Sequence, residues 1–354
     1  MKEQDKLVRA LRALAPGTPM REALENILRA KTGAVIVVDD SPQVMEIVEG
    51  GFHIDSEFRP SALYELAKMD GAIIMSADGQ RILRANVHLV PQAAIPSQET
   101  GIRHRIAERV ARQTGAMVIA ISQRRSLITL YQGTMKYMIR ETGFILTKAN
   151  QAVQTLEKYR AVLNQALNNL NLLEFEDVVT VYDVVRVLQR VEMVLRIAEE
   201  IKLYIVQLGS EGRLVSMQLE ELATGVEEEG LAVIRDYLVS QGDRVPDQVY
   251  KAVHQAPMEE LLDLVGLYRQ LGYVGPMALD QPVTPRGYRL LMKLPRLPLP
   301  VVENLVNSLG SLPQIMAASI EQLDAVEGIG EVRARNIKEG LRRLREQVLL
   351  DRHK

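Results

Sequence analysis

The 354-residue sequence contains no cysteine and no tryptophan, and aromatic residues make up only 4% of it. The lack of cysteine excludes disulfide bonds and thiolate metal sites, and it favours a reducing compartment such as the cytoplasm. The scarcity of aromatic side chains argues against base stacking as the main means of holding nucleic acid. Aliphatic side chains must therefore build the hydrophobic cores.

Apolar runs of membrane-spanning length are also absent, and the N-terminus MKEQDKLVRALRAL is too charged for a signal peptide. We therefore expect an intracellular protein without membrane association. The five histidines lie too far apart for a local zinc motif. A bound metal is thus expected to be a hard ion held by carboxylate and phosphate oxygens.

The net charge of −2 conceals a difference between segments. Residues 151–230 hold 7 Lys/Arg and 14 Asp/Glu, whereas residues 331–354 hold 8 Lys/Arg and 4 Asp/Glu. The basic C-terminal end indicates a polyanionic partner, and the acidic segment before it would repel one.

The segment 1–142 alternates helical and strand signals. Apolar, β-branched runs predict strands, and Asp78-Gly79 between two of them predicts a tight hairpin turn. An amphipathic stretch ending in Gly115 predicts a helix. The segments that carry these signals are 34–40, 71–89, 117–123 and 126–132 for strands and 101–115 for the helix. Strands mixed with helices predict an α/β domain around a mixed sheet.

The character of the sequence changes after this domain. The segment 143–288 carries apolar residues at three-to-four spacing over long stretches, which predicts a helical spacer domain. The Pro-rich run LPRLPLP (294–300) marks the next boundary, so a third domain of short helices is expected over 289–354. The fold class is therefore a multidomain protein in which an α/β domain precedes all-α regions.

The third domain contains a specific pattern. A helix opened by Ser319 leads to the turn EGIG (327–330), and a basic helix follows. Two glycines expose the backbone N–H groups of the turn, and the N-terminus of the next helix adds its positive dipole end, so the turn suits a phosphate. The residues expected to contact DNA are Gly328, Ile329, Gly330, Arg333, Arg335 and Lys338.

This pattern resembles the helix-hairpin-helix motif, which grips DNA phosphates without reading bases. The alternatives are a hairpin whose turn only packs two helices and a module that binds protein. In the latter case the segment VVENLVNSLGSLPQIMAAS (301–319) would be a degenerate partner hairpin.

Asp70-Gly71-Ala72 lies between a predicted helix and a predicted buried strand. From the local pattern alone, the favoured interpretation is a helix C-cap with Gly71 in the left-handed conformation. The run Arg103-His104-Arg105 follows Thr100-Gly101 at the start of a predicted helix, where cationic groups and the helix dipole would suit a triphosphate. Another basic pair, Arg124-Arg125, follows Ser122 in a tight turn, for which a solvated turn is the simpler interpretation.

Taken together, these segments resemble a known family. MDGAIIM (69–75), TGIRHRIAERVARQTGAMVIAIS (100–122) and SQRRSLITLY (122–131) are similar to the DGA and RHR motifs of diadenylate cyclases and their strand ends. The helical spacer and terminal hairpin resemble one branch of these enzymes, the DNA integrity scanning (DisA) family. The resemblance covers essentially the whole chain.

The resemblance implies that two ATP molecules, held by two protomers face to face, are joined into cyclic di-AMP with release of pyrophosphate. Asp70 would bind Mg²⁺ or Mn²⁺, and Gly71 would let the backbone approach the nucleotide. The residues expected to carry catalysis are Asp70, Gly71, Arg103, His104 and Arg105. The residues expected to bind ATP add Ala72, Thr100, Ile102, Ser122, Arg124 and Arg125.

The resemblance further implies a homo-oligomer, an octamer in this family, that binds branched or junction DNA and is associated with the nucleoid. Inhibition of synthesis by bound DNA is a hypothesis that follows from the two functions in one chain. Family members usually carry Thr at the position of Ile102, which predicts weaker activity. One alternative is a DNA-binding scaffold with a degenerate nucleotide-binding domain, and another is a nucleotidyltransferase acting on DNA ends.

Overall fold

The computed structural model describes residues 3–239, 245–275 and 277–351. The chain forms two compact units, the first made of Met1–Gln151 and Ile201–Met217 and the second of Ala152–Glu200 and Gln218–Lys354. Within the described residues no helix is both long and apolar enough to span a membrane. The domain boundaries expected after positions 142 and 288 stay predictions.

The first unit is built around an eight-stranded sheet in the order β2-β5-β4-β1-β6-β7-β8, with β3 added on β5. β1 and β4 run parallel, and the other pairs are antiparallel, so the predicted mixed sheet is confirmed. The strands are β1 Ala34–Val38, β2 Val48–Glu49, β3 Phe52–Glu57, β4 Ala72–Met75, β5 Arg81–Leu89, β6 Met117–Ser122, β7 Leu127–Gln132 and β8 Met135–Ile139. The helices of this region are α1 Glu3–Ala13, α2 Pro19–Arg29, α3 Pro42–Met45, α4 Pro60–Leu66 and α5 Ile102–Thr114.

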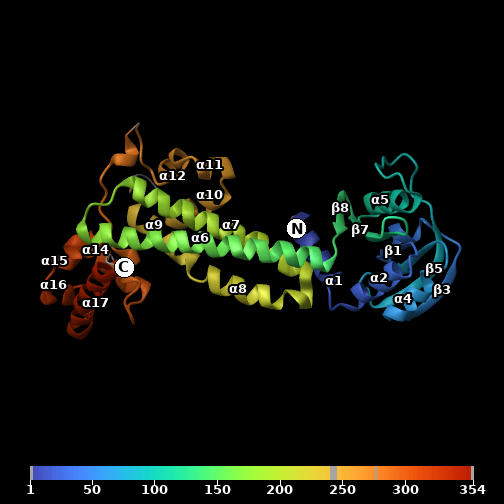
Figure 1. Ribbon diagram of the computed structural model, residues 1–354, viewed down its shortest axis with the longest axis horizontal. Coiled ribbons are helices and arrows are strands. Elements are labelled where there is room, and N and C mark those ends of the chain that lie inside the picture. The colour runs from blue at the N-terminus through green and yellow to red at the C-terminus, as the bar shows by residue number, and fades with distance from the viewer. Residues whose placement is uncertain (1–2, 240–244, 276, 352–354) are drawn as a thin grey trace. The chain divides into compact units, whose positions relative to one another are not determined.

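Helices cover both faces of the sheet: α5 lies over one face, and α2 and α4 lie over the other (Figure 1). All five residues of β1 are buried, because alternate side chains enter opposite cores. Ile36 packs on the α2 and α4 side, whereas Val35 and Val37 pack on the α5 side. Because both faces of β1 are buried, its sequence is a continuous apolar run.

Local signals specify several of these elements. Thr18 caps α2 by accepting a hydrogen bond from the Arg21 backbone N–H at 3.2 Å. The turn at Asp78-Gly79 joins β4 and β5, with Gly79 at φ +70°, as predicted. Gly115 ends α5 in the left-handed conformation at φ +75°. Strands β2, β3 and β8 were not predicted from the sequence.

The remainder of the described chain is helical, as expected. Two long helices, α6 and α7, contribute to both units. The helices are α6 Thr142–Glu176, α7 Val181–Leu208, α8 Arg213–Ala223, α9 Val226–Tyr237, α10 Pro246–Gln255, α11 Met258–Leu262, α12 Leu264–Gln270, α13 Tyr288–Leu291, α14 Leu299–Leu309, α15 Leu312–Ala317, α16 Ile320–Asp324 and α17 Glu331–Asp351, with short 3₁₀ turns at Gly209–Gly212 and Ala278–Asp280.

A buried polar network joins the end of α6 to α9 and α13 within the second unit. The guanidinium of Arg289 is fully buried and pairs with the buried carboxylate of Glu174, which also accepts the Tyr237 hydroxyl at 2.8 Å. The carboxylate of Asp236 accepts the backbone N–H groups of residues 287–289 at 2.7, 2.6 and 3.0 Å. Buried charges of this kind persist only when they are paired and hydrogen-bonded.

The end of the second unit contains two helical hairpins with the same spacing of their helix starts. Helices α13 and α14 begin at Tyr288 and Leu299, and helices α16 and α17 begin at Ile320 and Glu331. The two pairs of helix starts are therefore separated by the same interval along the chain. This equivalence places the turn of the partner hairpin at the Pro-rich run and its second helix, α14, mainly in the first part of segment 301–319.

The backbone of the two turns supports the equivalence. Arg296 lies at φ +61°, and Gly328, the corresponding position of the second hairpin, lies at φ +83°. The next residues, Leu297 and Ile329, are both buried in the core of this domain. Because an L-residue rarely adopts a positive φ, the conformation of Arg296 is a specific feature of the fold.

Candidate functional site

Three strand ends meet at one edge of the sheet and carry the motif residues. Antiparallel pairing sets Ile121 of β6 opposite Ala34 of β1, and parallel pairing sets Ala72 of β4 opposite Val35. The start of β1, the start of β4 and the end of β6 therefore lie together. This register brings Gly71 and Ser122 to the same edge, although they lie far apart in the sequence.

Asp70 lies at this edge with 91% of its side chain exposed. Its Oδ1 accepts the backbone N–H of Gly71 at 3.1 Å and the Arg103 guanidinium at 3.0 Å. These two contacts hold the pKa of the Asp70 carboxyl below its usual range, the N–H of Gly71 having the larger effect. Asp70 is therefore an exposed carboxylate at neutral pH.

Gly71 adopts a left-handed conformation at φ +95°, but it is not the C-cap of α4, because that helix ends with its cap at Ala67. The favoured local interpretation of a helix C-cap is thus wrong. A Cβ at Gly71 would lie 2.9 Å from the carbonyl carbon of Asn86 and from the Val87 carbonyl oxygen. Gly71 is required by the close approach of β5.

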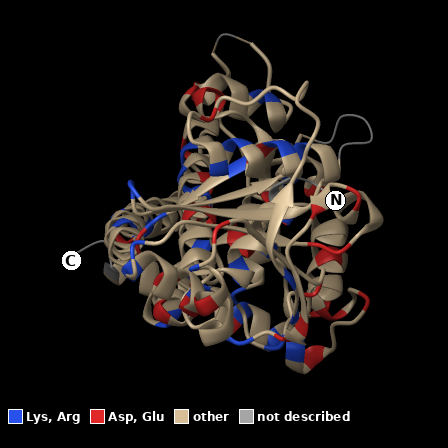
Figure 2. Ribbon diagram, turned by 90° about the vertical axis from the view of Figure 1, so that its right-hand side faces the viewer, with Lys and Arg blue, Asp and Glu red and all other residues tan. Residues whose placement is uncertain are grey.

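Helix α5 starts with the predicted basic run. Gly101 is its N-cap, with no side chain to cap the first N–H groups, so these groups are available to an anion. The side chain of Ile102 is 74% exposed. Arg105 turns back and donates to the carbonyls of Glu99 and Thr100 at 3.3 and 3.5 Å. Helix α5 contains several arginines along its length. Figure 2 shows the Lys and Arg residues of the chain in blue.

The guanidinium of Arg103 lies over Gly33, the residue before β1. A Cβ at Gly33 would lie 2.7 Å from Arg103 Nη1 and 3.2 Å from the Ile121 carbonyl oxygen. Gly33 therefore leaves the space that Arg103 needs to reach Asp70. No local sequence signal identified Gly33, because its role depends on the register of β1 and β6.

His104 is half-buried and makes an edge-to-face contact with Tyr131 of β7, with ring centroids 6.3 Å apart. Burial lowers the pKa of His104, and the cations around it add to this effect. The imidazole is therefore neutral near pH 7, and the arginines carry the charge of the basic run.

Ser122 ends β6, and its hydroxyl accepts the backbone N–H of Arg125 at 3.2 Å. Arg124 and Arg125 are exposed in the turn between β6 and β7. The Ile121 carbonyl oxygen, one residue before Ser122, and the Arg103 guanidinium both lie against Gly33, so the end of β6 and the basic run share one neighbourhood. The structure thus brings together the three predicted groups around positions 70–72, 100–105 and 122–125.

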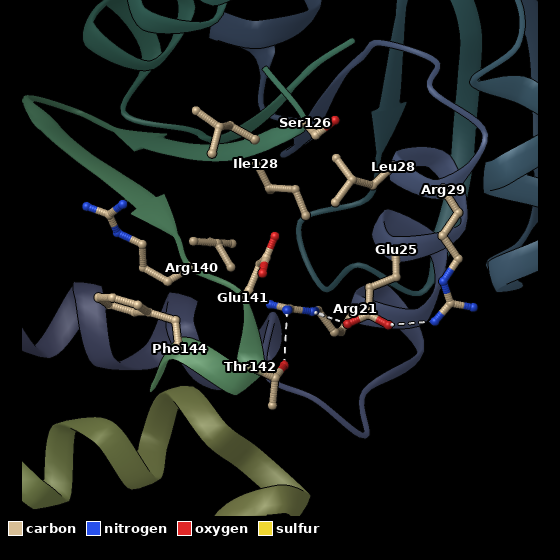
Figure 3. A pocket seen from close by; sticks show the side chains of 12 residues that line it. Arg21, Glu25, Leu28, Arg29, Ser126, Ile128, Arg140, Glu141, Thr142 and Phe144 are labelled. Carbon is tan, nitrogen blue, oxygen red and sulfur yellow. Dashed lines mark hydrogen bonds and ion pairs between the residues drawn. The ribbon is translucent and has the colours of Figure 1, made fainter. Parts of the chain in front are cut away.

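A pocket of about 440 Å³ lies elsewhere in the first unit (Figure 3). Its walls come from α2, β7, β8 and the start of α6, and Glu141 points into it between Arg21 and Arg140. Apart from Ser126 to Ile128, which follow Arg125 in the turn and β7, it contains no part of the motif segments. The candidate nucleotide site therefore lies in a different part of the first unit, where the side chains of Asp70 and Ile102 are largely exposed.

Within the described residues there is no group of three or more His, Asp or Glu side chains placed to hold a metal ion. Asp70 stands as a single exposed carboxylate oxygen donor, which suits the hard ions Mg²⁺ and Mn²⁺ if phosphate oxygens complete the coordination. The residues present therefore fit a metal that arrives with a nucleotide.

The second candidate site is the EGIG turn. Gly328 is left-handed, and a Cβ at Gly330 would meet no atom within 4 Å, so the backbone is open there. Ile329 is 5% exposed and its N–H donates to the Val326 carbonyl, so it supports the turn from inside. Arg333 donates to the Gly328 carbonyl, Arg335 pairs with Glu331, and Lys338 donates to the Ala318 carbonyl.

Two family descriptions match the chain. The nucleotide-binding domain of the DisA bacterial checkpoint controller matches residues 21–135, and the linker region of the same controller matches residues 139–279. The first match contains the sheet edge with Asp70 and the basic run.

Relatives match over almost the whole length. The chain is 61% identical to the DNA integrity scanning protein DisA of Carboxydothermus hydrogenoformans, covering 98% of this chain and 99% of that protein. It is 56% identical to DisA of Clostridium botulinum strain Langeland, covering 99% of each. A solved structure of a DacA double mutant from Staphylococcus aureus is 21% identical, covers 40% of this chain and 91% of its own, and gives a TM-score of 0.30. On the identity and coverage of its relatives, the chain belongs to the DisA family of DNA integrity scanning proteins and is a diadenylate cyclase.

Proposed function

We propose that two protomers place their sheet edges face to face and condense two ATP molecules into cyclic di-AMP and two pyrophosphates. The observation that carries this proposal is the exposed Asp70–Arg103 pair beside the free N-terminus of α5. A single protomer leaves Asp70 and Ile102 largely in solvent. A second protomer bearing the second nucleotide would cover them, and a two-fold product suits a two-fold interface.

In each half-reaction the 3′-hydroxyl of one ATP attacks the α-phosphorus of the other. A new 3′-oxygen–phosphorus bond forms, the bond between the α-phosphorus and the bridging oxygen breaks, and pyrophosphate leaves with its electron pair. The Asp70 carboxylate would accept the hydrogen bond of the attacking hydroxyl, and the hydroxyl proton would pass by way of this carboxylate to solvent. Two such steps close the ring.

Each residue at this end of the sheet would have a role that follows from its position. Arg103 would neutralise phosphate charge while keeping Asp70 oriented, and the first N–H groups of α5 would bind phosphate oxygens. Arg124 and Arg125 would reach the same triphosphate from the turn. Asp70 would hold Mg²⁺ or Mn²⁺, which would supply charge neutralisation at the phosphates. Catalysis in this scheme is mainly positioning and electrostatic stabilisation.

Dilution of the enzyme tests the paired site. Because two protomers form one site, we expect the specific rate of cyclic di-AMP formation to fall as the protein is diluted below the dissociation constant of its assembly. Light scattering should show an assembly of at least two chains at the concentrations where the specific rate is full, and smaller species where the rate has fallen; we propose the octamer of the family. A fully active monomer would contradict the paired site.

We further propose that the C-terminal domain binds branched DNA through its two hairpin turns, without reading sequence, and so associates with the nucleoid. The repeated geometry of Arg296 and Gly328 supports two equivalent phosphate contacts. The segment 331–354 is basic in sequence, with 8 Lys/Arg against 4 Asp/Glu, and helix α17 begins directly after the second turn. The contacts of Arg333 and Lys338 with backbone carbonyls are ones that a phosphate oxygen could replace.

Fluorescence anisotropy with a labelled four-way junction tests this module. Arg333→Ala and Lys338→Ala should each weaken binding about five- to tenfold and reduce its salt dependence, because each removes one phosphate contact. Arg29→Ala, an exposed arginine of the first unit, serves as the control. Unchanged affinity in both variants would contradict the assignment.

Finally, we propose that DNA bound at the hairpins reduces cyclase activity. The test is the initial rate of cyclic di-AMP formation at saturating junction DNA, with duplex DNA of equal length beside it. A lower rate with the junction supports the coupling, and equal rates contradict it.

A further inference from the structure

Glu99 lies beside the candidate nucleotide site but outside the DGA and RHR motifs. It precedes α5, and only 13% of its side chain is exposed. Its Oε1 accepts the Tyr131 hydroxyl at 2.8 Å, and the ammonium group of Lys136 pairs with the same oxygen. One carboxylate therefore joins the loop before α5 to β7 and β8.

The backbone of the same loop is held from the other side. Arg105 donates to the carbonyl oxygens of Glu99 and Thr100. The loop is thus fixed through the Glu99 side chain and also through its main chain. Because the loop leads directly into the N-terminus of α5, its position determines where the basic run begins.

Tyr131, which is hydrogen-bonded to Glu99, also contacts His104. The Tyr131 side chain is buried, so its hydroxyl needs a partner, and Glu99 provides it. The tyrosine ring meets the imidazole at an interplanar angle of 79°. Glu99 therefore fixes the ring against which His104 packs.

Glu99 also acts through its negative charge. Burial acts to raise the pKa of this carboxyl, but the hydrogen bonds from Lys136 and Tyr131 outweigh it and hold the pKa below its usual range. Glu99 is thus an anion paired with Lys136 beneath a cationic surface. The pair is close to neutral, so it supports the basic run without repelling a triphosphate.

We propose that Glu99 is a positioning residue for the cyclase reaction, acting through Tyr131 and Lys136 to hold the Arg103-His104-Arg105 run in the geometry that binds the triphosphate. This inference rests on the proposed use of that run for ATP. The hydrogen bonds of Glu99 join it to Tyr131 and Lys136 and not to Asp70, so its effect passes through these side chains.

The variants Glu99→Gln and Tyr131→Phe test the proposal, with the exposed Glu57→Gln as a matched control. Glu99→Gln keeps an acceptor for Tyr131 but loses the charge that holds Lys136, and Tyr131→Phe keeps the ring but loses its hydroxyl. We expect Glu99→Gln to raise KM for ATP about tenfold, with a smaller change in kcat, and Tyr131→Phe to have a weaker effect in the same direction. The control should match wild type.

A pH profile separates positioning from general loss of structure. The groups that face His104 are Glu99 from the loop, Tyr131 from β7, Lys136 from β8, Arg125 from the turn and Arg103 from its own helix. Because Glu99 acts to raise the pKa of His104, Glu99→Gln should move any histidine limb of the kcat/KM profile to lower pH. A loss that follows only the melting temperature, with the profile unmoved, would overturn the proposal.

Binding of a non-hydrolysable ATP analogue, measured by calorimetry, distinguishes this proposal from the cyclase mechanism itself. Weaker binding by Glu99→Gln supports the positioning role even if wild type forms no cyclic di-AMP. Unchanged analogue affinity together with unchanged KM in a folded Glu99→Gln protein would contradict it.

Discussion

Arg103 Nη2 lies 3.0 Å from Asp70 Oδ1, although the two residues are distant in the sequence. The contact joins the start of β4 to the first turn of α5 across the sheet edge. Because Asp70 remains almost fully exposed, the pair is a weak stabiliser of the fold but a well-placed pair of charges for a ligand. The variants of Gly33 and Ile102 probe the surroundings of this pair.

Gly33→Ala should impair the cyclase without unfolding it. The new Cβ would lie 2.7 Å from Arg103 Nη1, so the guanidinium must shift from the position in which it pairs with Asp70. A displacement of this size at a charged site is expected to lower kcat/KM by about tenfold or more. Gly143→Ala is the control, since its Cβ would meet no atom within 4 Å and helix α6 favours alanine. Equal activity of Gly33→Ala and wild type would contradict the role of Gly33.

Ile102→Thr should lower KM for ATP. Ile102 is the first residue of α5, and its side chain is exposed beside the free N–H groups of the helix. A hydroxyl there offers one more hydrogen bond to a phosphate, worth about 1 kcal/mol or a roughly fivefold change in KM. Steady-state kinetics beside Val90→Thr, an exposed valine of the same unit, would measure it. A KM that does not fall would show that the hydroxyl has no partner.

Strands with one or both faces buried could be predicted from the sequence, whereas strands that are defined only by their pairing could not. Strands β1 and β4 are fully buried apolar runs, so their pattern is visible in the sequence. Strand β3 (FHIDSE) is largely exposed and lacks a buried apolar face, so nothing local marks it as a strand.

The same distinction applies to the site. The basic run is contiguous in the sequence and was therefore visible. The contact of Glu99 with Tyr131 and Lys136 depends on three segments brought together by the sheet, and the space over Gly33 depends on strand register. Such relationships have no local signature.

The contribution of Asp236 to the stability of the fold should fall as pH rises from about 4 to 7. Burial, together with nearby Glu174, raises the pKa of Asp236 to about 7. The folded state then binds a proton that the unfolded state releases at lower pH, so this contribution is present at low pH and is lost through pH 7. Asp236→Asn should flatten the dependence in urea unfolding at pH 4.5, 6 and 7.5. An identical slope in the variant would show that Asp236 is ionised throughout.

Arg289→Met should destabilise the second unit by about 3–5 kcal/mol, because it leaves the buried Glu174 carboxylate without its cation. Adding Glu174→Gln to Arg289→Met should recover part of the loss, since the uncompensated charge is removed. Urea unfolding of the two single variants and the double variant measures the coupling. Strictly additive losses would contradict the paired arrangement.

Whether Asp70 serves the cyclase can be measured as the rate of cyclic di-AMP formation from ATP and Mg²⁺ in wild type, Asp70→Asn and Asp78→Asn. Both aspartates precede a glycine and have a pKa below the usual range, so Asp78 is a matched control. We expect Asp70→Asn to lose about 100-fold or more of the rate and Asp78→Asn to retain it. Full activity of Asp70→Asn, or equal losses in both variants, would contradict this role of Asp70.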